Sequence, residues 1–395
     1  MNAPTAPAHP HHHVETVTRH ASLPGRDLAL SAALARLYGR TTHHLSASEC
    51  ETMAVAELLA LADAEDAARW HGLRLSYTDP LGAPWLRDTI AGRYAGIGPE
   101  GLVCFAGAQE GLYAVLHALL QPGSHAVVVV PGYQSVETLA MGLASVTGVA
   151  LDGDDGWSLD IDAVAAAMRP NTCAVCISFP NNPTGKLLEP DRYQALVALC
   201  RRHGAWLVSD EVYRLTERDP ARRLPPAAEA YERGVSIGVL SKAYGLPGLR
   251  IGWVACRDRA LTRRIAAFRQ YLSVCSAGPS EVLASIALKA TAAITGRNRA
   301  LADANLLLLQ AMLARHPGLF GWTVPDGGVV GYVRYGGAEG VERFVLRMAE
   351  QAGVLLLPAS VFRSDLLTLP ANRFRIGFGH AGVPAGLAAM EAALG

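Results

Sequence analysis

Lys242 is the residue of this sequence that most directly calls for a chemical explanation. It follows an apolar run in the stretch GVLSKAYGLPGLRIGW (residues 238–253). Of the 35 lysines and arginines only Lys186, Lys242 and Lys289 are lysines. An ammonium group can lose its proton and act as a nucleophile, whereas a guanidinium cannot. Lys242 is therefore a candidate reactive amine, provided that suitable partners lie elsewhere in the chain.

Polar side chains follow three successive apolar runs. Asn182 comes after TCAVCISFP, Asp210 and Tyr213 come after AWLVS, and Lys242 comes after VSIGVL. Each has a plain structural explanation, respectively as the first residue of a type I turn Asn-Pro-Thr-Gly, as a cap of the next segment, and as a solvated loop residue. Three such endings in a row favour one shared site.

Pyridoxal phosphate catalysis is the chemistry that uses this set of residues. A lysine amine forms a Schiff base with the cofactor aldehyde, and a carboxylate faces the pyridine nitrogen. Asp210 would keep that nitrogen protonated, so that the ring withdraws electrons from the substrate Cα. Tyr213 and Asn182 would contact the ring hydroxyl and tune the proton affinity of the imine. We therefore expect an enzyme that acts on an L-α-amino acid through a Lys242 Schiff base.

The elements that must position these residues follow an alternating pattern. Apolar runs alternate with helix-period segments such as 108–120 and 190–203, which is typical of β-α-β units. The runs are continuous rather than alternating in polarity, as expected for a doubly wound parallel sheet with helices on both faces. Ligands bind such sheets at the carboxyl ends of the strands. The expected strands are LVCFA, HAVVVVP, TCAVCISFP, AWLVSD, VSIGVL and RIGWVAC.

The C-terminal part of the sequence changes character. Helical stretches cover about 258–315, and WTVPDGG, VVGYVRY, GVLLLPAS and RFRIGFG then alternate with helical 340–352 and 383–393. This pattern predicts a smaller α+β domain beside a large α/β domain. We expect an N-terminal arm and lead-in segment at 1–50, a large cofactor-binding domain at 51–290, and a small C-terminal domain at 291–395.

The motifs NNPTG, SDEVY, SKAYGLPGLRIGW and FRIGFG together resemble those of the fold-type I, class I and II aminotransferases, from about residue 70 to the end. The segment HHLSASECETMAVAELL, taken with LSKAYGLPGLRIGW, resembles the group that contains capreomycidine synthase, whose members can perform eliminations and ring closures. The resemblance implies that Lys242 carries the cofactor, that Asp210 pairs with the pyridinium, that Tyr213 and Asn182 contact the ring hydroxyl, and that Arg250 binds phosphate.

The same resemblance assigns further residues. A helix that begins at Ala108 and Gln109 would bind the phosphate through its free N–H groups, and Tyr133 would stack on the ring. Tyr77 would reach the phosphate of a second subunit, which implies a homodimer with active sites at the interface. The implied substrate-binding residues are Arg375, which would clamp the α-carboxylate, together with Asn182, Ser46 and Ala47.

One position departs from the family pattern. Val239 stands where a serine or threonine commonly contacts the phosphate, so Ser241 or water would replace that hydroxyl. For several of the other residues a structural explanation stays open, because Ala108 and Gln109 could form an ordinary strand-to-helix turn, Tyr133 could lie at the edge of the core, and Arg375 could be an exposed strand residue.

Composition excludes several classes of protein. The formal charge is zero and the pI is about 7.2, which argues against nucleic acid or anionic membranes as partners. Without an apolar run long enough for a membrane span or a signal peptide, and with seven scattered cysteines, we expect a cytoplasmic protein. Cys173 and Cys176 are expected to be core residues. We expect no metal site, and we assign the histidines near the N-terminus, His9 and His11 to His13, no function.

Two reaction outcomes stay open at this point. Transamination is the commonest outcome in the family. The alternative is a specialised biosynthetic enzyme that performs β- or γ-elimination, replacement or cyclisation on a substrate such as S-adenosylmethionine or an arginine derivative. A pyridoxal phosphate-binding regulator is disfavoured, since a DNA-binding module needs roughly 60 to 70 residues and only about 40 poorly patterned residues precede LSASEC.

Overall fold

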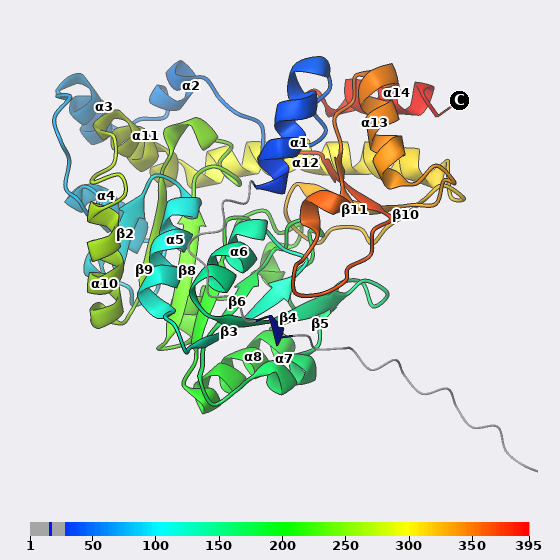
Figure 1. Cartoon of the computed structure of the whole chain (residues 1–395). Coiled ribbons are helices and arrows are strands. Elements are labelled where there is room, and N and C mark those ends of the chain that lie inside the picture. The colour runs from blue at the N-terminus through cyan, green and yellow to red at the C-terminus, as the bar shows by residue number, and fades with distance from the viewer. Residues whose placement is uncertain (1–15, 18–27, 395) are drawn as a thin grey trace, which may run out of the picture.

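The larger of two sheets forms the centre of the protein (Figure 1). The computed structural model describes residues 16–17 and 28–394, so the N-terminal histidines lie outside the described residues. The described sheet has nine strands in the order β1-β4-β3-β6-β7-β8-β9-β2, with β5 paired to β4. Its strands are β1 (Thr16–Val17), β2 (Leu102–Phe105), β3 (His125–Val130), β4 (Ser145–Asp152), β5 (Ser158–Leu159), β6 (Thr172–Ser178), β7 (Trp206–Asp210), β8 (Gly234–Val239) and β9 (Gly252–Cys256).

Burial on both faces explains why these strands are so apolar. All six residues of β3 are buried. Val128 packs in a core cluster with α5 and α6, while its neighbour Val127 packs in another cluster with α7 and α8. Successive side chains of a strand point to opposite faces, so both faces require apolar residues. These helices are α5 (Ala108–Leu119), α6 (Gln134–Leu143), α7 (Ile161–Ala167) and α8 (Pro190–His203).

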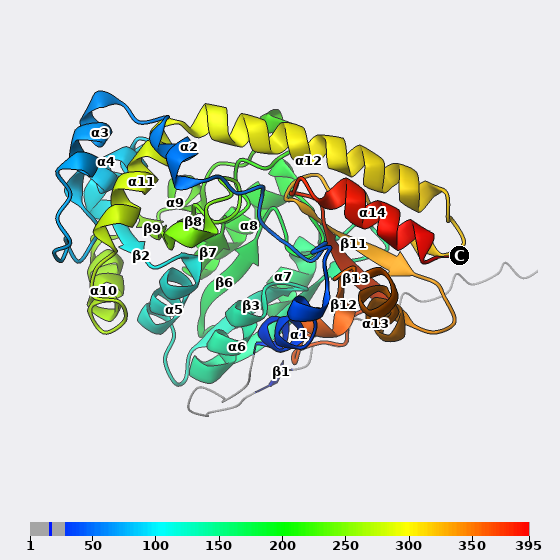
Figure 2. The same cartoon turned by 90° about the horizontal axis from the view of Figure 1, so that it is seen from above.

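A smaller antiparallel sheet lies beside the first, in the order β10-β11-β13-β12. Leu45 and Cys50 of the N-terminal part pack into its core, so chain ends that are far apart in sequence meet there. The long helix α12 crosses from α11 to α14 and spans both parts (Figure 2). The elements are β10 (Phe320–Gly321), β11 (Val330–Tyr335), β12 (Leu357–Pro358), β13 (Arg373–Gly377), α12 (Thr291–Ala314), α13 (Val341–Ala352) and α14 (Val383–Ala392).

The remaining helices flank the large sheet and the N-terminal segment. Helix α11 contacts α2, α3 and α4, and α10 lies along α5. Their bounds are α1 (Ala29–Leu37), α2 (Val55–Leu59), α3 (Ala64–His71), α4 (Pro84–Ala91), α9 (Ala227–Ala230), α10 (Arg259–Gln270) and α11 (Gly278–Lys289), and short 3₁₀ turns occur at Tyr38–Arg40, Pro99–Gly101, Pro220–Arg222, Pro247–Leu249 and Ala359–Phe362.

The expected fold class, a large and mostly parallel sheet with a smaller α+β part, is confirmed. Three details differ from expectation. Strands β9 and β2 are antiparallel to their neighbours, and β4, whose glycine and polar residues weaken the apolar pattern, was not expected. WTVPDGG is loop throughout, since its proline and two glycines do not suit a strand.

Two further observations concern the described part of the chain. None of its helices is both long and apolar enough to cross a membrane. Within residues 16–17 and 28–394, no group of three or more histidine, cysteine or acidic side chains is arranged to hold a metal ion. All seven cysteines are free; Cys176 is buried in the core and Cys173 packs at its edge.

Candidate active site

A cavity of about 250 Å³ lies at the carboxyl ends of β6, β7 and β8. Its position agrees with the general rule for parallel sheets. Strand ends supply Ser178, Asp210 and Val239 to its wall. Ten of the predicted site residues line it, namely Ala108, Gln109, Tyr133, Asn182, Asp210, Tyr213, Ser241, Lys242, Arg250 and Arg375.

Asp210 ends strand β7 inside this cavity. Burial raises the pKa of its carboxyl group to about 6, although the Val212 N–H and the Lys242 charge act in the opposite direction. The Val212 N–H donates to Asp210 Oδ1 over 3.1 Å, which orients the carboxyl group. A buried carboxyl group with an elevated pKa is poised to receive a cationic partner, such as a protonated pyridine nitrogen.

Lys242 follows strand β8 and reaches the cavity from the neighbouring strand end. Burial lowers the pKa of its amine; the charges of Arg375 and Arg250 act in the same direction, against Glu49 and Asp210. Its Nζ donates to Ser48 Oγ over 2.8 Å. A lysine with a lowered pKa is a better nucleophile and base near neutral pH than an exposed one.

The N-terminal strap (residues 45–51) holds three of the site side chains. The Tyr213 hydroxyl donates to the Ser48 carbonyl over 2.7 Å, and burial raises its pKa. Arg375 Nη2 donates to the Ser46 carbonyl over 2.6 Å. The strap approaches strand β13 so closely at Gly377 that a Cβ there would collide with the Ala47 carbonyl oxygen. This contact explains the first glycine of the motif FRIGFG.

Asn182 and Arg375 meet in the cavity from different parts of the chain. Arg375 Nη1 donates to Asn182 Oδ1 over 2.9 Å. The turn that carries Asn182 starts one residue earlier than expected, because the Gly185 N–H donates to the carbonyl of Asn181 over 2.8 Å. The side chain of Asn181 is buried and donates to the Pro131 carbonyl, which anchors this turn against the neighbouring strand end.

The opposite end of the cavity suits an anion. Helix α5 begins at Ala108, and Gly107 before it makes no side-chain cap, so the first N–H groups of the helix are available. Gly107 has φ = 90°, and a Cβ at this position would collide with the Arg250 guanidinium. Arg250, Ser241 and Val239 complete this end of the wall. A helix N-terminus with an arginine is a phosphate-binding arrangement.

Three predicted residues lie outside this cavity. Ser46 and Ala47 line a second cavity that shares Arg375 with the first. Tyr77 is 88% exposed and does not line the cavity of its own chain. Its exposure is compatible with a contact to another subunit.

Sequence reasoning missed Ser48, Glu49 and His380. Glu49 Oε2 lies 3.9 Å from Lys242 Nζ, and Glu49 Oε1 lies 3.6 Å from His380 Nε2. Although burial alone would raise the pKa of Glu49, the nearby His380 and Lys242 lower it to about 2. The pair with Glu49 raises the pKa of His380. The polar stretch SASECE was the available signal, but no spacing connected it to Lys242.

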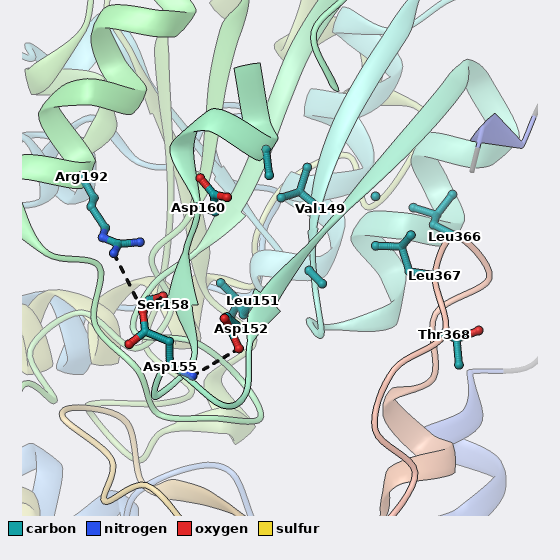
Figure 3. A pocket seen from close by; sticks show the side chains of 13 residues that line it. Val149, Leu151, Asp152, Asp155, Ser158, Asp160, Arg192, Leu366, Leu367 and Thr368 are labelled. Atoms are coloured by element: carbon teal, nitrogen blue, oxygen red, sulfur yellow. Dashed lines mark hydrogen bonds and ion pairs between the residues drawn. The ribbon is translucent and has the colours of Figure 1, made fainter. Parts of the chain in front are cut away.

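A larger cavity, about 670 Å³, lies elsewhere, along strand β4, which lies between β1 and β3 in the sheet. Figure 3 shows Arg192, Asp155 and Asp160 on one side of it and Leu366 and Leu367 on the other. The Asp160 carboxylate caps helix α7, and Asp155 pairs with Arg192 over 4.0 Å. These polar groups have structural roles, and none of the predicted site residues lies in this cavity.

The residues of the smaller cavity fit pyridoxal phosphate in three respects. The α5 N-terminus and Arg250 suit its phosphate, a buried carboxyl group suits its ring nitrogen, and a lysine with a lowered pKa suits its aldehyde. The collision that a Cβ at Gly107 would cause also shows that backbone and guanidinium are closely packed at the phosphate end.

Sequence relatives agree with this chemistry. The family model described as aminotransferase class I and II matches residues 12–387. The chain is 31% identical to capreomycidine synthase of Streptomyces vinaceus over 322 residues, which cover 80% of each chain. It is 35% identical to an arginine–pyruvate transaminase of Pseudomonas aeruginosa over 186 residues, which cover 45% of this chain and 47% of that one.

Solved structures share the fold. A PLP-dependent aminotransferase from Streptococcus suis superposes with a TM-score of 0.87 and 28% identity, over 95% of this chain and 98% of that one. The PLP-dependent cyclase OrfR superposes with a TM-score of 0.82 and 29% identity, over 94% of this chain and 98% of the cyclase. Proteins with this fold thus include both an aminotransferase and a cyclase.

Proposed function

The chain belongs to the class I and II aminotransferase family and is a pyridoxal phosphate-dependent enzyme, and from this premise we propose that Lys242 binds the cofactor and that an L-α-amino acid is the substrate. Bound pyridoxal phosphate supplies an electron sink for the negative charge that develops at the substrate Cα. The observation that carries the proposal is the meeting of Lys242, Asp210 and Arg375 in one cavity.

Each residue then has a defined task. Asp210 holds a proton at the pyridine nitrogen, and Tyr213 and Asn182 hydrogen-bond the ring hydroxyl. Lys242 moves the proton at Cα, for which a lowered pKa suits it. The remaining contacts are those of Ala108, Gln109, Arg250 and Ser241 with the phosphate, of Tyr133 with the ring face, and of Arg375, Asn182, Ser46 and Ala47 with the substrate.

Amino exchange is the first candidate reaction. Its test mixes the yellow holoenzyme with a panel of amino acids and follows the spectrum and the products together. A keto acid that forms in step with the amine form of the cofactor would establish transamination. Products without amino exchange would exclude it.

A specialised elimination, replacement or cyclisation is the second candidate, and it would serve the biosynthesis of natural products. The relation to capreomycidine synthase over 80% of the chain and the likeness to a PLP-dependent cyclase favour it. Substrates such as S-adenosylmethionine or an arginine derivative would carry a leaving group or an internal nucleophile. In the same panel, loss of that group at an ordinary rate of about 1 s⁻¹ or above, with slow exchange of glutamate and alanine, would identify this reaction.

We also propose a cytoplasmic homodimer. Leu75, Tyr77 and Tyr271 expose most of their apolar surface, and the segments that carry them are joined where Thr78 Oγ1 donates to the Ser276 carbonyl. Large exposed apolar side chains on neighbouring segments suit a subunit interface. Seven free cysteines suit a reducing compartment.

A further inference from the structure

A second cavity of about 410 Å³ adjoins the one that contains Lys242. The strap and the segment after β13 form most of its wall. Both cavities share Leu30, Ser48 and Arg375. A ligand whose carboxylate binds Arg375 therefore lies at the junction, and its side chain can extend into the second cavity.

Arg375 gives independent evidence for an anionic ligand at this junction. It is only 1% exposed, and its two Nη atoms donate to Asn182 and to the Ser46 carbonyl. Its buried Nε has no hydrogen-bond partner among the described residues, and no described carboxylate forms an ion pair with it. A buried guanidinium without a counter-ion is costly, so a carboxylate is the expected partner.

Two carboxylates bring negative charge to the wall of the second cavity. Glu49 and Glu51 both line it, and His380 lies between them, 3.6 Å from one carboxylate and 3.8 Å from the other. His380 can offset the charge of only one of these two carboxylates, and only while it is protonated. Glu49, Glu51 and His380 each keep about a quarter of their side-chain surface exposed, so a ligand can reach them.

Lys242 is the other cation close to Glu49. The inference rests on the proposed function here: once Lys242 is joined to the cofactor, its nitrogen is no longer an ammonium group with three N–H donors, so its interaction with Glu49 is weakened. An additional cation close to Glu49 then becomes favourable, whereas a further carboxylate would be repelled.

We propose that Glu49, held by His380 and assisted by Glu51, binds the positively charged end of the substrate side chain. The substrate is accordingly an L-α-amino acid with a guanidinium or ammonium group on its side chain, whose α-carboxylate binds Arg375. Glutamate and aspartate, the usual dicarboxylic partners of aminotransferases, are poor ligands for this cavity.

The test compares two ligands that differ in charge and little in shape, L-arginine and L-citrulline. Their dissociation constants come from titrating the holoenzyme while following the cofactor spectrum. Arginine is expected to bind about tenfold or more tightly than citrulline, since a charged partner strengthens a hydrogen bond by that order. In Glu49→Gln the ratio is expected to fall toward one, while Glu339→Gln, a surface variant, keeps the wild-type ratio.

Two outcomes overturn the proposal: equal affinities in the wild type, or an unchanged ratio in Glu49→Gln. The wild type alone provides a second measurement should the variant fail to fold. Raising the salt from about 0.05 to about 0.5 M must weaken arginine binding and leave citrulline binding nearly unchanged, and equal salt effects contradict the proposal. If no amino acid perturbs the cofactor spectrum, the proposed function fails instead, so the two failures are distinguishable.

Discussion

The amine of Lys242 lies 2.8 Å from the hydroxyl of Ser48, although 194 positions separate the two residues in the chain. The backbone carbonyl oxygen of the same serine accepts a hydrogen bond from the Tyr213 hydroxyl. One residue of the strap thus contacts two of the side chains proposed to bind the cofactor. We expect cofactor binding at Lys242 to replace its contact with Ser48, which would couple the strap to the cofactor.

Replacing Lys242 by alanine should abolish the visible absorbance of the lysine-bound cofactor and leave a folded protein, because the role proposed for Lys242 is chemical. Lys186→Ala is the matched control, since Lys186 forms ion pairs with Glu189 and Asp326 away from the cavity. Borohydride reduction followed by peptide mapping checks the assignment. A label on Lys186 or Lys289 would refute it.

Replacing Asp210 by asparagine should change how stability depends on pH. The folded protein raises the pKa of Asp210 from 3.8 to about 6, so the cofactor-free protein binds this proton more tightly than the unfolded chain does. Protonated Asp210 therefore makes its full contribution to the free energy of unfolding below about pH 4. This contribution is lost as the pH rises through about 6, a change of up to about 3 kcal/mol.

Urea unfolding of the cofactor-free protein at several pH values measures this effect. Asp210→Asn should flatten the profile between about pH 4 and 6, whereas Asp162→Asn, an exposed control, should not. The holoenzyme of Asp210→Asn should also lose most of its turnover, because a neutral amide cannot stabilise a pyridinium. Near-normal turnover would mean that Asp210 is only structural.

Arg375→Lys should weaken amino-acid binding about 10- to 100-fold, because one ammonium replaces two directed donors. Spectral titration of the holoenzyme measures this affinity. Arg373→Lys is a suitable control on the same strand, since Arg373 stacks over Trp157 instead of lining the cavity. Unchanged affinity in Arg375→Lys would place the carboxylate site elsewhere.

Val239→Thr should tighten cofactor binding about tenfold, since it adds a hydroxyl at the phosphate end in a nearly isosteric side chain. Ser241→Ala should have the opposite effect if Ser241 substitutes for that hydroxyl. Equilibrium titration of the cofactor-free protein with pyridoxal phosphate measures both. A weaker or unchanged affinity in Val239→Thr would show that the added hydroxyl does not reach the phosphate.

Mixing subunits tests whether Tyr77 acts in a neighbouring subunit. When Lys242→Ala and Tyr77→Ala are unfolded and refolded together, hybrid dimers contain one site with neither defect, and about a quarter of wild-type activity should return. A mixture of Lys242→Ala with Asp210→Asn should stay inactive, because both residues serve the same subunit. No recovery in the first mixture would rule out a shared site.

The sequence alone determined the cofactor chemistry and the order of the strands along the chain. Asn182, Asp210 and Lys242 each lie within two residues of the end of an apolar run, and parallel strands bring their carboxyl ends to one edge. The local pattern was therefore enough to predict that these residues would line one cavity. The reversed direction of β9, which is antiparallel to both β8 and β2, was not predicted, because strand direction depends on which neighbours pair in space.

Only the tertiary structure brought Glu49 and His380 to the cavity. These residues lie on irregular segments far apart in sequence; His380 directly follows the motif FRIGFG, but nothing in that motif relates it to Glu49. Backbone hydrogen bonds join the segments, from the Gly377 N–H to the Leu45 carbonyl and from the Glu51 N–H to the Gly379 carbonyl. Such long-range pairing depends on how the two sheets pack, and packing leaves no periodic signal in the sequence. The fold, and not a local sequence pattern, therefore decides that Glu49 and His380 face the region proposed to bind the substrate side chain.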